Sequence, residues 1–166
     1  MAIPTEPRYR TMNKPIGSAQ EQLLAVLQTA NNRLEHLTRN DWVLIIDRAK
    51  QLIFKKGGTL IWQGKQTKMV YLLVKGRAKV KADFETRMAE IGPGEICGEM
   101  SFLDHGHASA SVIAEEDVEV HAVEWSTLED LFEMFPHLAS RFYQSLAVNL
   151  SRRVREQISP TQSGKS

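Results

Sequence analysis

Short β-prone runs separated by glycine-containing turns fill the centre of this 166-residue chain. From residue 51 onward the runs are interrupted at Lys56-Gly57-Gly58, at Gln63-Gly64-Lys65 and at Lys75-Gly76-Arg77. Two more runs, ASASVIAEE and VEVHAVE, follow between residues 108 and 124. Many short strands at turn-to-turn spacing are typical of an antiparallel barrel or jelly roll.

Segments with helical periodicity precede these runs. Residues 18–37 carry leucines at helical spacing, with Ser18 as a candidate N-cap and an interruption near Asn31-Asn32. A second short helix is predicted from about Asn40. Its core-facing residues would be Trp42, Ile45, Ile46 and Ala49.

Two further helices are predicted after the strands. The segment from Ser126 to Glu129 fits a capping box, and Phe135-Pro136 would end the helix that it begins. A longer helix follows over residues 137–157. We therefore predict an α+β fold, in which an antiparallel β-roll or jelly roll (a double-stranded β-helix) of about eight strands is flanked by N-terminal helices and a C-terminal helical pair.

The composition indicates one globular domain, since 42% of the residues are hydrophobic and 25% are charged. We place this domain at residues 18–157, between a disordered lead-in (1–17) and a disordered tail (158–166). The net charge of +1 gives no support for a nucleic acid or membrane partner, and the apolar runs are too short to span a bilayer. The single cysteine, Cys97, excludes an internal disulfide, so a cytoplasmic location is expected.

Glycines and small residues crowd the segment GPGEICGEMSFLDHGHASASV, residues 92–112. Gly98 permits a close approach of the backbone to a ligand. A short helix beginning there would direct the N–H groups of Met100 and Ser101 at one anion. Glu99 is a carboxylate suited to accept a hydrogen bond from a hydroxyl group.

The small residues that follow leave room for a ligand against the next strand. These are Ala108, Ser109 and Ala110. Together with residues 98–101 they form the predicted ligand-binding site. We expect no metal at it, because the chain has no cluster of cysteine and histidine at zinc spacing.

The pattern from about residue 34 to residue 155 resembles the cyclic nucleotide-binding domain of catabolite-activator-type regulators, cyclic-nucleotide-dependent kinases and gated channels. MVYLLVKGRAKV, residues 69–80, is similar to the family's strand–turn–strand segment. GEICGEMSFL resembles its phosphate-binding cassette, in which Gly-Glu opens a one-turn helix. The resemblance implies that Glu99 binds a ribose 2′-OH and that the ligand is cyclic AMP or another cyclic nucleotide, with no further cofactor.

One residue departs from the family pattern. ASASV stands where the family has Arg-x-Ala-Ser/Thr-Val, so the arginine that neutralises the cyclic phosphate is replaced by Ala108. Losing such a partner of a buried anion costs about 2–5 kcal/mol. No lysine or arginine lies between Arg87 and Arg141. His105 and His107 are the nearest candidates to replace the charge, and an exposed loop is their alternative interpretation.

Three interpretations of the cavity stay open. It binds a cyclic mononucleotide with weak or altered affinity, or it binds another ligand, such as a neutral or differently charged nucleotide or metabolite. In the third interpretation it binds nothing, and the fold serves as a scaffold for protein interaction or assembly. In each case we predict a non-catalytic module, because the chain contains no GxSxG, HExxH or Walker motif.

The predicted helix at residues 137–157 has two interpretations. The resemblance implies a lid and the contact of a homodimer, whereas packing on its own barrel explains an apolar stripe equally well. The cluster Arg152, Arg153 and Arg155 could contact phosphates, and the preferred interpretation is a solvated helix end that interacts favourably with the helix dipole. A protein partner or a second copy would receive the signal, since only SPTQSGKS follows Ile158 and no DNA-binding helix-turn-helix is expected.

Cys97 falls inside the predicted cassette. A thiol near a helix N-terminus can be reactive, which makes redox sensing a hypothesis for this residue. A small buried apolar side chain is the alternative interpretation.

Overall fold

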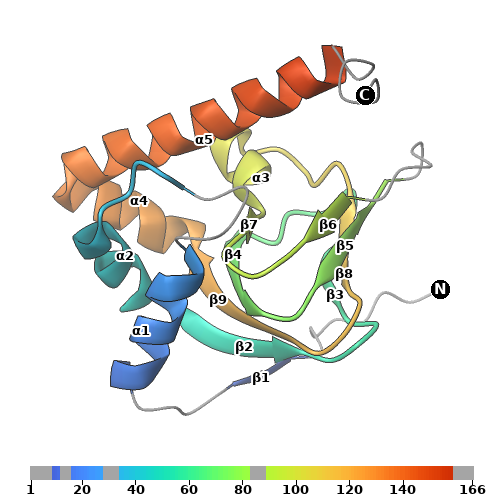
Figure 1. Cartoon of the computed structure of the whole chain (residues 1–166). Helices are drawn as coiled ribbons and strands as arrows, with labels where there is room; N and C mark the ends of the chain where they lie inside the picture. Colours follow the sequence, from blue (N-terminus) through green and yellow to red (C-terminus); the bar gives the residue numbers. More distant parts are fainter. Residues whose placement is uncertain (1–8, 12–15, 28–33, 83–88, 159–166) are drawn as a thin grey trace, which may run out of the picture.

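The computed structural model describes residues 9–11, 16–27, 34–82 and 89–158. Nine strands lie in this part of the chain (Figure 1): β1 Tyr9–Thr11, β2 Lys50–Phe54, β3 Thr59–Ile61, β4 Met69–Lys75, β5 Ala78–Lys81, β6 Ala89–Ile91, β7 Ile96–Cys97, β8 Ser111–Ala114 and β9 Val118–Glu124. Five helices accompany them: α1 Ile16–Leu27, α2 Arg39–Ile46, α3 Glu99–Asp104, α4 Trp125–Met134 and α5 Pro136–Ile158.

The strands form two sheets that face each other as a roll. One sheet has the order β1-β2-β9-β4-β7 and the other has the order β3-β8-β5-β6. Every pairing in them is antiparallel. The predicted α+β fold, an antiparallel β-roll between N-terminal and C-terminal helices, is therefore confirmed.

The inside of the roll is an apolar core. On β2 and β9, Leu52 pairs with Val120 and Phe54 with Val118, and all four side chains are buried. Alternate residues of a strand point to opposite faces, so this register directs the same face of both strands inward. The ring of Phe54 also makes an edge contact with that of Tyr71 on β4, at 5.8 Å between centroids.

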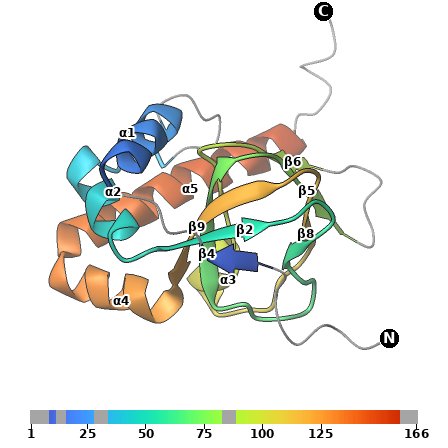
Figure 2. The same cartoon turned by 90° about the horizontal axis from the view of Figure 1, so that it is seen from below.

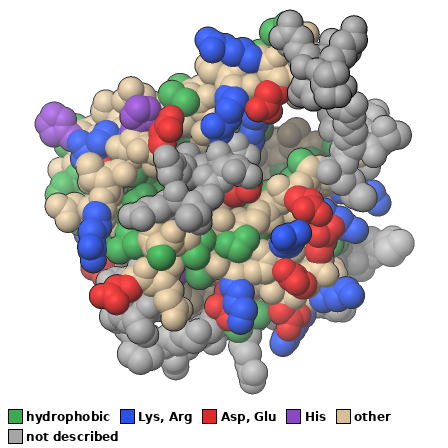
Figure 3. All heavy atoms as spheres, viewed as in Figure 1, with side chains coloured by type: hydrophobic (Ala, Val, Ile, Leu, Met, Phe, Trp, Pro, Cys, Tyr) green, Lys and Arg blue, Asp and Glu red, His purple; other side chains and the backbone are tan. Residues whose placement is uncertain are grey.

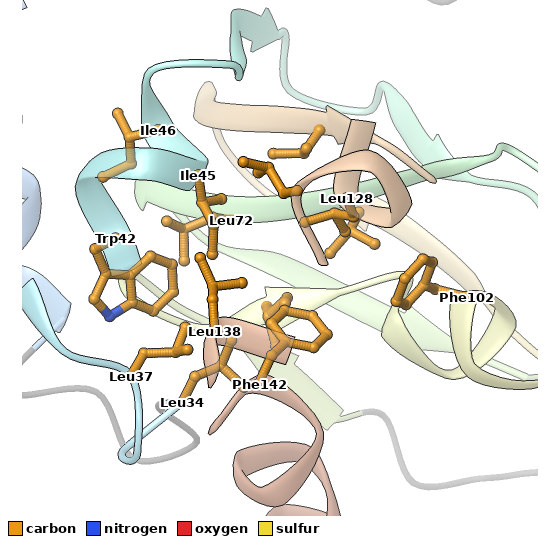
Figure 4. Packing of buried hydrophobic residues seen from close by; sticks show 14 of the residues in the cluster. Leu34, Leu37, Trp42, Ile45, Ile46, Leu72, Phe102, Leu128, Leu138 and Phe142 are labelled. Carbon is orange, nitrogen blue, oxygen red and sulfur yellow. The ribbon is translucent and has the colours of Figure 1, made fainter. Parts of the chain in front are cut away.

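The helices pack on one end of the roll around a second core (Figures 1 and 2). Figure 4 shows that Trp42 and Ile45 of α2 point toward Leu138 and Phe142 of α5. Leu128 of α4 belongs to the same cluster. Burial of these large side chains fixes α4 and α5 against the roll.

Two helix boundaries test the predicted caps. The capping box predicted at Ser126–Glu129 is wrong, because the N-cap is Glu124, two residues before Ser126, so that α4 begins at Trp125 and its N-cap makes no side-chain hydrogen bond. The predicted end at Phe135-Pro136 is confirmed, since Phe135 leaves the helical conformation and α5 begins at Pro136.

The N-terminal part differs from the expected pattern in one respect. Tyr9–Thr11 form β1 on the edge of β2, within the segment expected to be a lead-in. The helix predicted from residue 18 is present as Ile16–Leu27, and its continuation at 28–33 lies outside the described residues. The division into lead-in, domain and tail stays a prediction, and the tail beyond Ile158 is likewise not described.

The first half of α5 packs on its own chain. Leu138, Phe142 and Leu146 are buried, whereas Val154 and Ile158 near the end of the helix are exposed. The buried half supports the interpretation that the apolar stripe packs on its own fold, and the predicted homodimer through residues 137–157 stays a prediction. None of the described helices combines the length and the apolar character needed to cross a membrane.

Candidate functional site

A cavity of about 690 Å³ opens between α3, the sheet that contains β5 and β6, and the end of α5. Its apolar wall includes Ile61, Val80 and Val112. The predicted site residues all line it: Gly98, Glu99, Met100, Ser101, Ala108, Ser109 and Ala110. The structure thus brings both halves of the predicted site to one cavity, whose size is within the range of small-molecule sites. That these residues bind a ligand stays a prediction.

Gly98 sets the direction in which α3 begins. Its backbone is left-handed, with φ at +87°, and its carbonyl accepts the amide of Phe102 at 3.3 Å. A Cβ atom at this position would lie 2.7 Å from the carbonyl oxygen of Met69 and 3.6 Å from the Cα of Val70. Only glycine meets both conditions, so the chain turns sharply from β7 into α3.

Replacing Gly98 with alanine is expected to lower the free energy of unfolding by at least about 2 kcal/mol. The left-handed backbone contributes part of this loss, and the contact with the β4 backbone contributes the rest. Gly57→Ala is the matched control, since Gly57 also has a positive φ, at +84°, but has nothing within 4 Å of the added Cβ. Urea unfolding of both variants measures the difference. Equal losses of unfolding free energy would show that the close contact with Met69 does not destabilise Gly98→Ala.

Glu99 is the first residue of α3 and is buried, at 6% exposure, although it lines the cavity. Burial raises the pKa of its carboxyl group above the usual range. A hydrogen bond from its own backbone amide and the nearby Arg153 act in the opposite direction. A carboxylate in this position is an acceptor for a ligand hydroxyl group that enters the cavity.

The end of α5 closes one side of the cavity with Arg153, Glu156 and Gln157. An Nη1 atom of Arg153 lies 3.5 Å from Oε1 of Glu99, which is 54 residues away in the sequence. The interpretation of the arginine cluster as a solvated helix end is therefore wrong for Arg153. In the sequence, Arg153 is marked only by its place in a cluster of three arginines, which does not indicate that it faces Glu99.

Ala108 lies where the next strand approaches the cavity. Its carbonyl accepts the amide of Gly64 at 2.8 Å, and its own amide donates to the carbonyl of Lys65 at 2.9 Å. The backbone is thus held in place, while the side chain ends at a methyl group. Neither His105 nor His107 lines the cavity, and both are exposed, so within the described part the exposed-loop interpretation holds for both histidines.

Cys97 lines the cavity from β7 but is 4% exposed. Burial, together with the charges of Glu99 and Glu95, raises the pKa of the thiol well above its usual range. The thiolate is the reactive form of cysteine, so this environment opposes the redox-sensing hypothesis and favours a small apolar packing residue.

Acidic residues outnumber basic ones among the described residues that line the cavity. Glu90, Glu95 and Glu156 line it together with Glu99. The remainder of the surface seen in Figure 3 carries charges of both signs close together, in keeping with the net charge of +1. Among the described residues around the cavity, no excess of positive charge therefore offsets the missing basic residue at position 108.

Phe102 connects the cavity to the helices. It lies on α3, is buried, and makes edge contacts with Trp125, Phe132 and Phe142 at 6.0–6.2 Å between ring centroids. Its ring is also parallel to that of Tyr143 at 6.5 Å. No pattern in the sequence marks Phe102 as a contact between the cavity and the helices, because its partners come from α4 and α5.

Comparison with known proteins places residues 51–135 in a family described as the cyclic nucleotide-binding domain. The cyclic AMP receptor protein of Thermus thermophilus is 32% identical over 117 residues, which cover 68% of this chain and 52% of that protein. Cyclic GMP-binding protein C of Dictyostelium discoideum is 29% identical over 137 residues, which cover 75% of this chain and 5% of that protein. The chain thus spans about half of the first relative and a small part of the second.

Solved structures have the same fold. A cyclic nucleotide-binding domain from Methylobacillus flagellatus superposes with a TM-score of 0.74 at 19% identity, covering 95% of this chain and 90% of that one, which shows likeness of fold. The catabolite activator protein of Thermus thermophilus gives a TM-score of 0.62 at 29% identity, covering 80% and 59%. From the matched family, the fold and the site at β7 and α3, we conclude that this chain belongs to the cyclic nucleotide-binding domain family.

Proposed function

We propose that this chain is a non-catalytic regulatory module whose cavity binds a cyclic nucleotide. The observation that carries the proposal is the buried carboxylate of Glu99, which lines a cavity of about 690 Å³ at the start of α3. In the proposed complex, Glu99 accepts a hydrogen bond from the ribose 2′-OH of the nucleotide. The first backbone amides of α3 and the small residues 108–110 receive the cyclic phosphate. The printed names of two relatives, a cyclic AMP receptor and a cyclic GMP-binding protein, support this ligand class.

Phe102 would transmit a ligand-induced change in α3 to the helices α4 and α5. A ligand that contacts Glu99 at the beginning of α3 shifts or stiffens this short helix. Because Phe102 is packed against rings of α4 and α5, a displacement of α3 has to be accommodated by those helices. Movement of α4 and α5 against the roll is thus the proposed output.

The receiver of this output would be another protein, a second copy of the chain, or a part of a longer polypeptide. The chain spans 52% of its Thermus relative, so the activity of a whole protein is part of this proposal. We propose no direct contact with DNA or a membrane. A reducing compartment such as the cytoplasm agrees with the single, buried, free Cys97.

The competing function is a scaffold that binds no ligand. Ala108 favours it, because the residue that lies in the cavity at this position offers no charge to a phosphate. Glu99 favours the sensor, because its buried carboxylate is held by Arg153 through a contact of 3.5 Å, and a ligand hydroxyl group would add a hydrogen bond that offsets the cost of its burial. Calorimetric titration with cyclic AMP, cyclic GMP and cyclic dinucleotides separates the two functions, since a scaffold gives no heat with any of them.

The role of Glu99 is tested by Glu99→Gln. We expect this variant to bind cyclic AMP about tenfold or more weakly, because a hydrogen bond to a charged acceptor is lost. Its affinity for 2′-deoxy cyclic AMP is expected to equal that of the parent chain. The substitution keeps the shape of the side chain and removes a buried charge, so the thermal midpoint should not fall. An equal loss for both nucleotides would show that Glu99 does not bind the 2′-OH.

A further inference from the structure

The cavity contains one basic side chain among the residues that the structure describes, and it comes from α5. Arg153 lines the cavity beside Glu99, whereas Lys65, next to Ala108 in the backbone pairing, is not part of the lining. Arg152 and Arg155, its neighbours in the same helix end, are outside the lining as well. Among the described lining residues, Arg153 is therefore the one cation, and it comes from a helix far in the sequence from Ala108.

The guanidinium of Arg153 is not fixed in its present place. Its contact with Glu99 runs through one nitrogen and one oxygen at 3.5 Å, and its side chain is 39% exposed. A bidentate arginine pair has two contacts at about 2.7–2.9 Å. The long side chain of Arg153 thus retains freedom to rotate from Glu99 toward an anion in the same cavity.

We propose that Arg153 supplies the positive charge for the phosphate of the ligand, in place of the residue at position 108. The ligand class is then a nucleotide with an anionic phosphate, held between the amides of α3 on one side and the end of α5 on the other. This inference rests on the proposed function. It also reassigns Glu99, which is released from Arg153 when a ligand hydroxyl group takes its place.

Arg153 would couple the binding of the phosphate to the position of α5. A cation on the strand side would bind phosphate wherever α5 lies, whereas Arg153 can do so only while the end of α5 covers the cavity. Binding of the phosphate therefore favours the conformation in which this helix end is docked. Binding of the phosphate and docking of the end of α5 would therefore be coupled in this chain.

The experiment compares cyclic AMP with adenosine, which lacks the phosphate, by calorimetric titration of the full chain. We expect Arg153→Ala to lower the affinity for cyclic AMP by at least about tenfold and to leave that for adenosine unchanged. Arg153→Lys keeps the charge, so its affinity for cyclic AMP should fall less than that of Arg153→Ala. Arg155→Ala is the matched control, since it removes the same charge from an exposed position in the same helix end.

A second background separates direct contact from repulsion. Removing Arg153 leaves Glu99 without its nearby cation, and the carboxylate alone would repel a phosphate. The loss caused by Arg153→Ala should therefore persist when it is repeated in the Glu99→Gln variant. If it disappears there, Arg153 only neutralises Glu99 and the proposal is overturned.

The other outcomes are equally distinct. Equal losses for cyclic AMP and adenosine would mean that Arg153 holds α5 in place without contacting phosphate, which overturns the proposal. Unchanged affinity for cyclic AMP in Arg153→Ala overturns it while the proposed function stands. If the parent chain binds no cyclic nucleotide at all, the proposed function fails and this inference fails with it. Thermal unfolding of every variant verifies that the fold is intact.

Discussion

Replacing Ala108 with arginine is expected to raise the affinity for cyclic AMP by at least about 30-fold. Ala108 lines the cavity, and its backbone is held by hydrogen bonds to Gly64 and Lys65 that do not involve the side chain. The new side chain can therefore enter a space of about 690 Å³ without displacing the strand. It would offer the phosphate a charge-assisted contact in a partly desolvated site.

Two controls isolate the charge. Ala108→Gln introduces a long polar side chain without a charge, and Ala147→Arg adds the same charge on the exposed face of α5. Calorimetric titration of all three variants with cyclic AMP should show tight binding for Ala108→Arg alone. If Ala108→Gln binds as tightly, side-chain length explains the gain. No gain in Ala108→Arg would contradict the assignment of α3 and residues 108–110 as a phosphate site.

The two arginines should not act independently. If Arg153 contacts the phosphate in the parent chain, a second cation from position 108 addresses the same group. Removing Arg153 from the Ala108→Arg variant should then cost less affinity than removing it from the parent. Groups that share one partner are generally non-additive, and the size of the deviation measures how far both reach the same anion.

The fold could be predicted because its signals are local. Glycine turns such as that at Gly76 interrupt the β-prone runs at regular spacing, and Pro136 marks the boundary between the last two helices. The failures have a common cause. β1 forms only because the edge of β2 is available, and the start of α4 at Trp125 follows from packing of that residue in the helical core.

The lining of the cavity could be predicted where its residues lie close together in the sequence. Residues 98–101 and 108–110 are close in sequence, so a local pattern was sufficient to predict that they line one cavity, and their binding of a ligand stays a prediction. Arg153 and Phe102 contact segments far away in the chain, and their partners depend on where α5 crosses the roll. A sequence pattern shows that a helix is amphipathic, but not which cavity its last turns will cover.

Loss of Arg141 is expected to reduce the free energy of unfolding by about 3 kcal/mol at neutral pH. This residue of α5 binds Asp41 of α2 through Nε at 2.6 Å and Nη2 at 2.8 Å, across 100 residues of sequence. Asp41 also accepts the backbone amide of Thr38 at 2.9 Å and is buried, at 3% exposure. Arg141→Ala would leave this carboxylate buried without its cation. Urea unfolding measures the loss, and Arg48→Ala, at an exposed position, is expected to change little.

The same ion pair predicts how stability depends on pH. Hydrogen bonds from Arg141 hold the pKa of Asp41 below its usual value of 3.8. The folded protein therefore releases this proton at a lower pH than the unfolded chain, and the stability gained from the pair is fully present above about pH 4 to 5. It is lost as the pH falls through the folded pKa of Asp41. The difference in unfolding free energy between the parent chain and Arg141→Ala should thus be large at pH 7 and small near pH 2.

In the Asp41→Asn background, Arg141→Ala should lower the unfolding free energy little at either pH, because no carboxylate remains for the arginine to stabilise. A difference that stays constant down to pH 2 would show that Arg141 stabilises α5 through packing of its side chain and not through its charge.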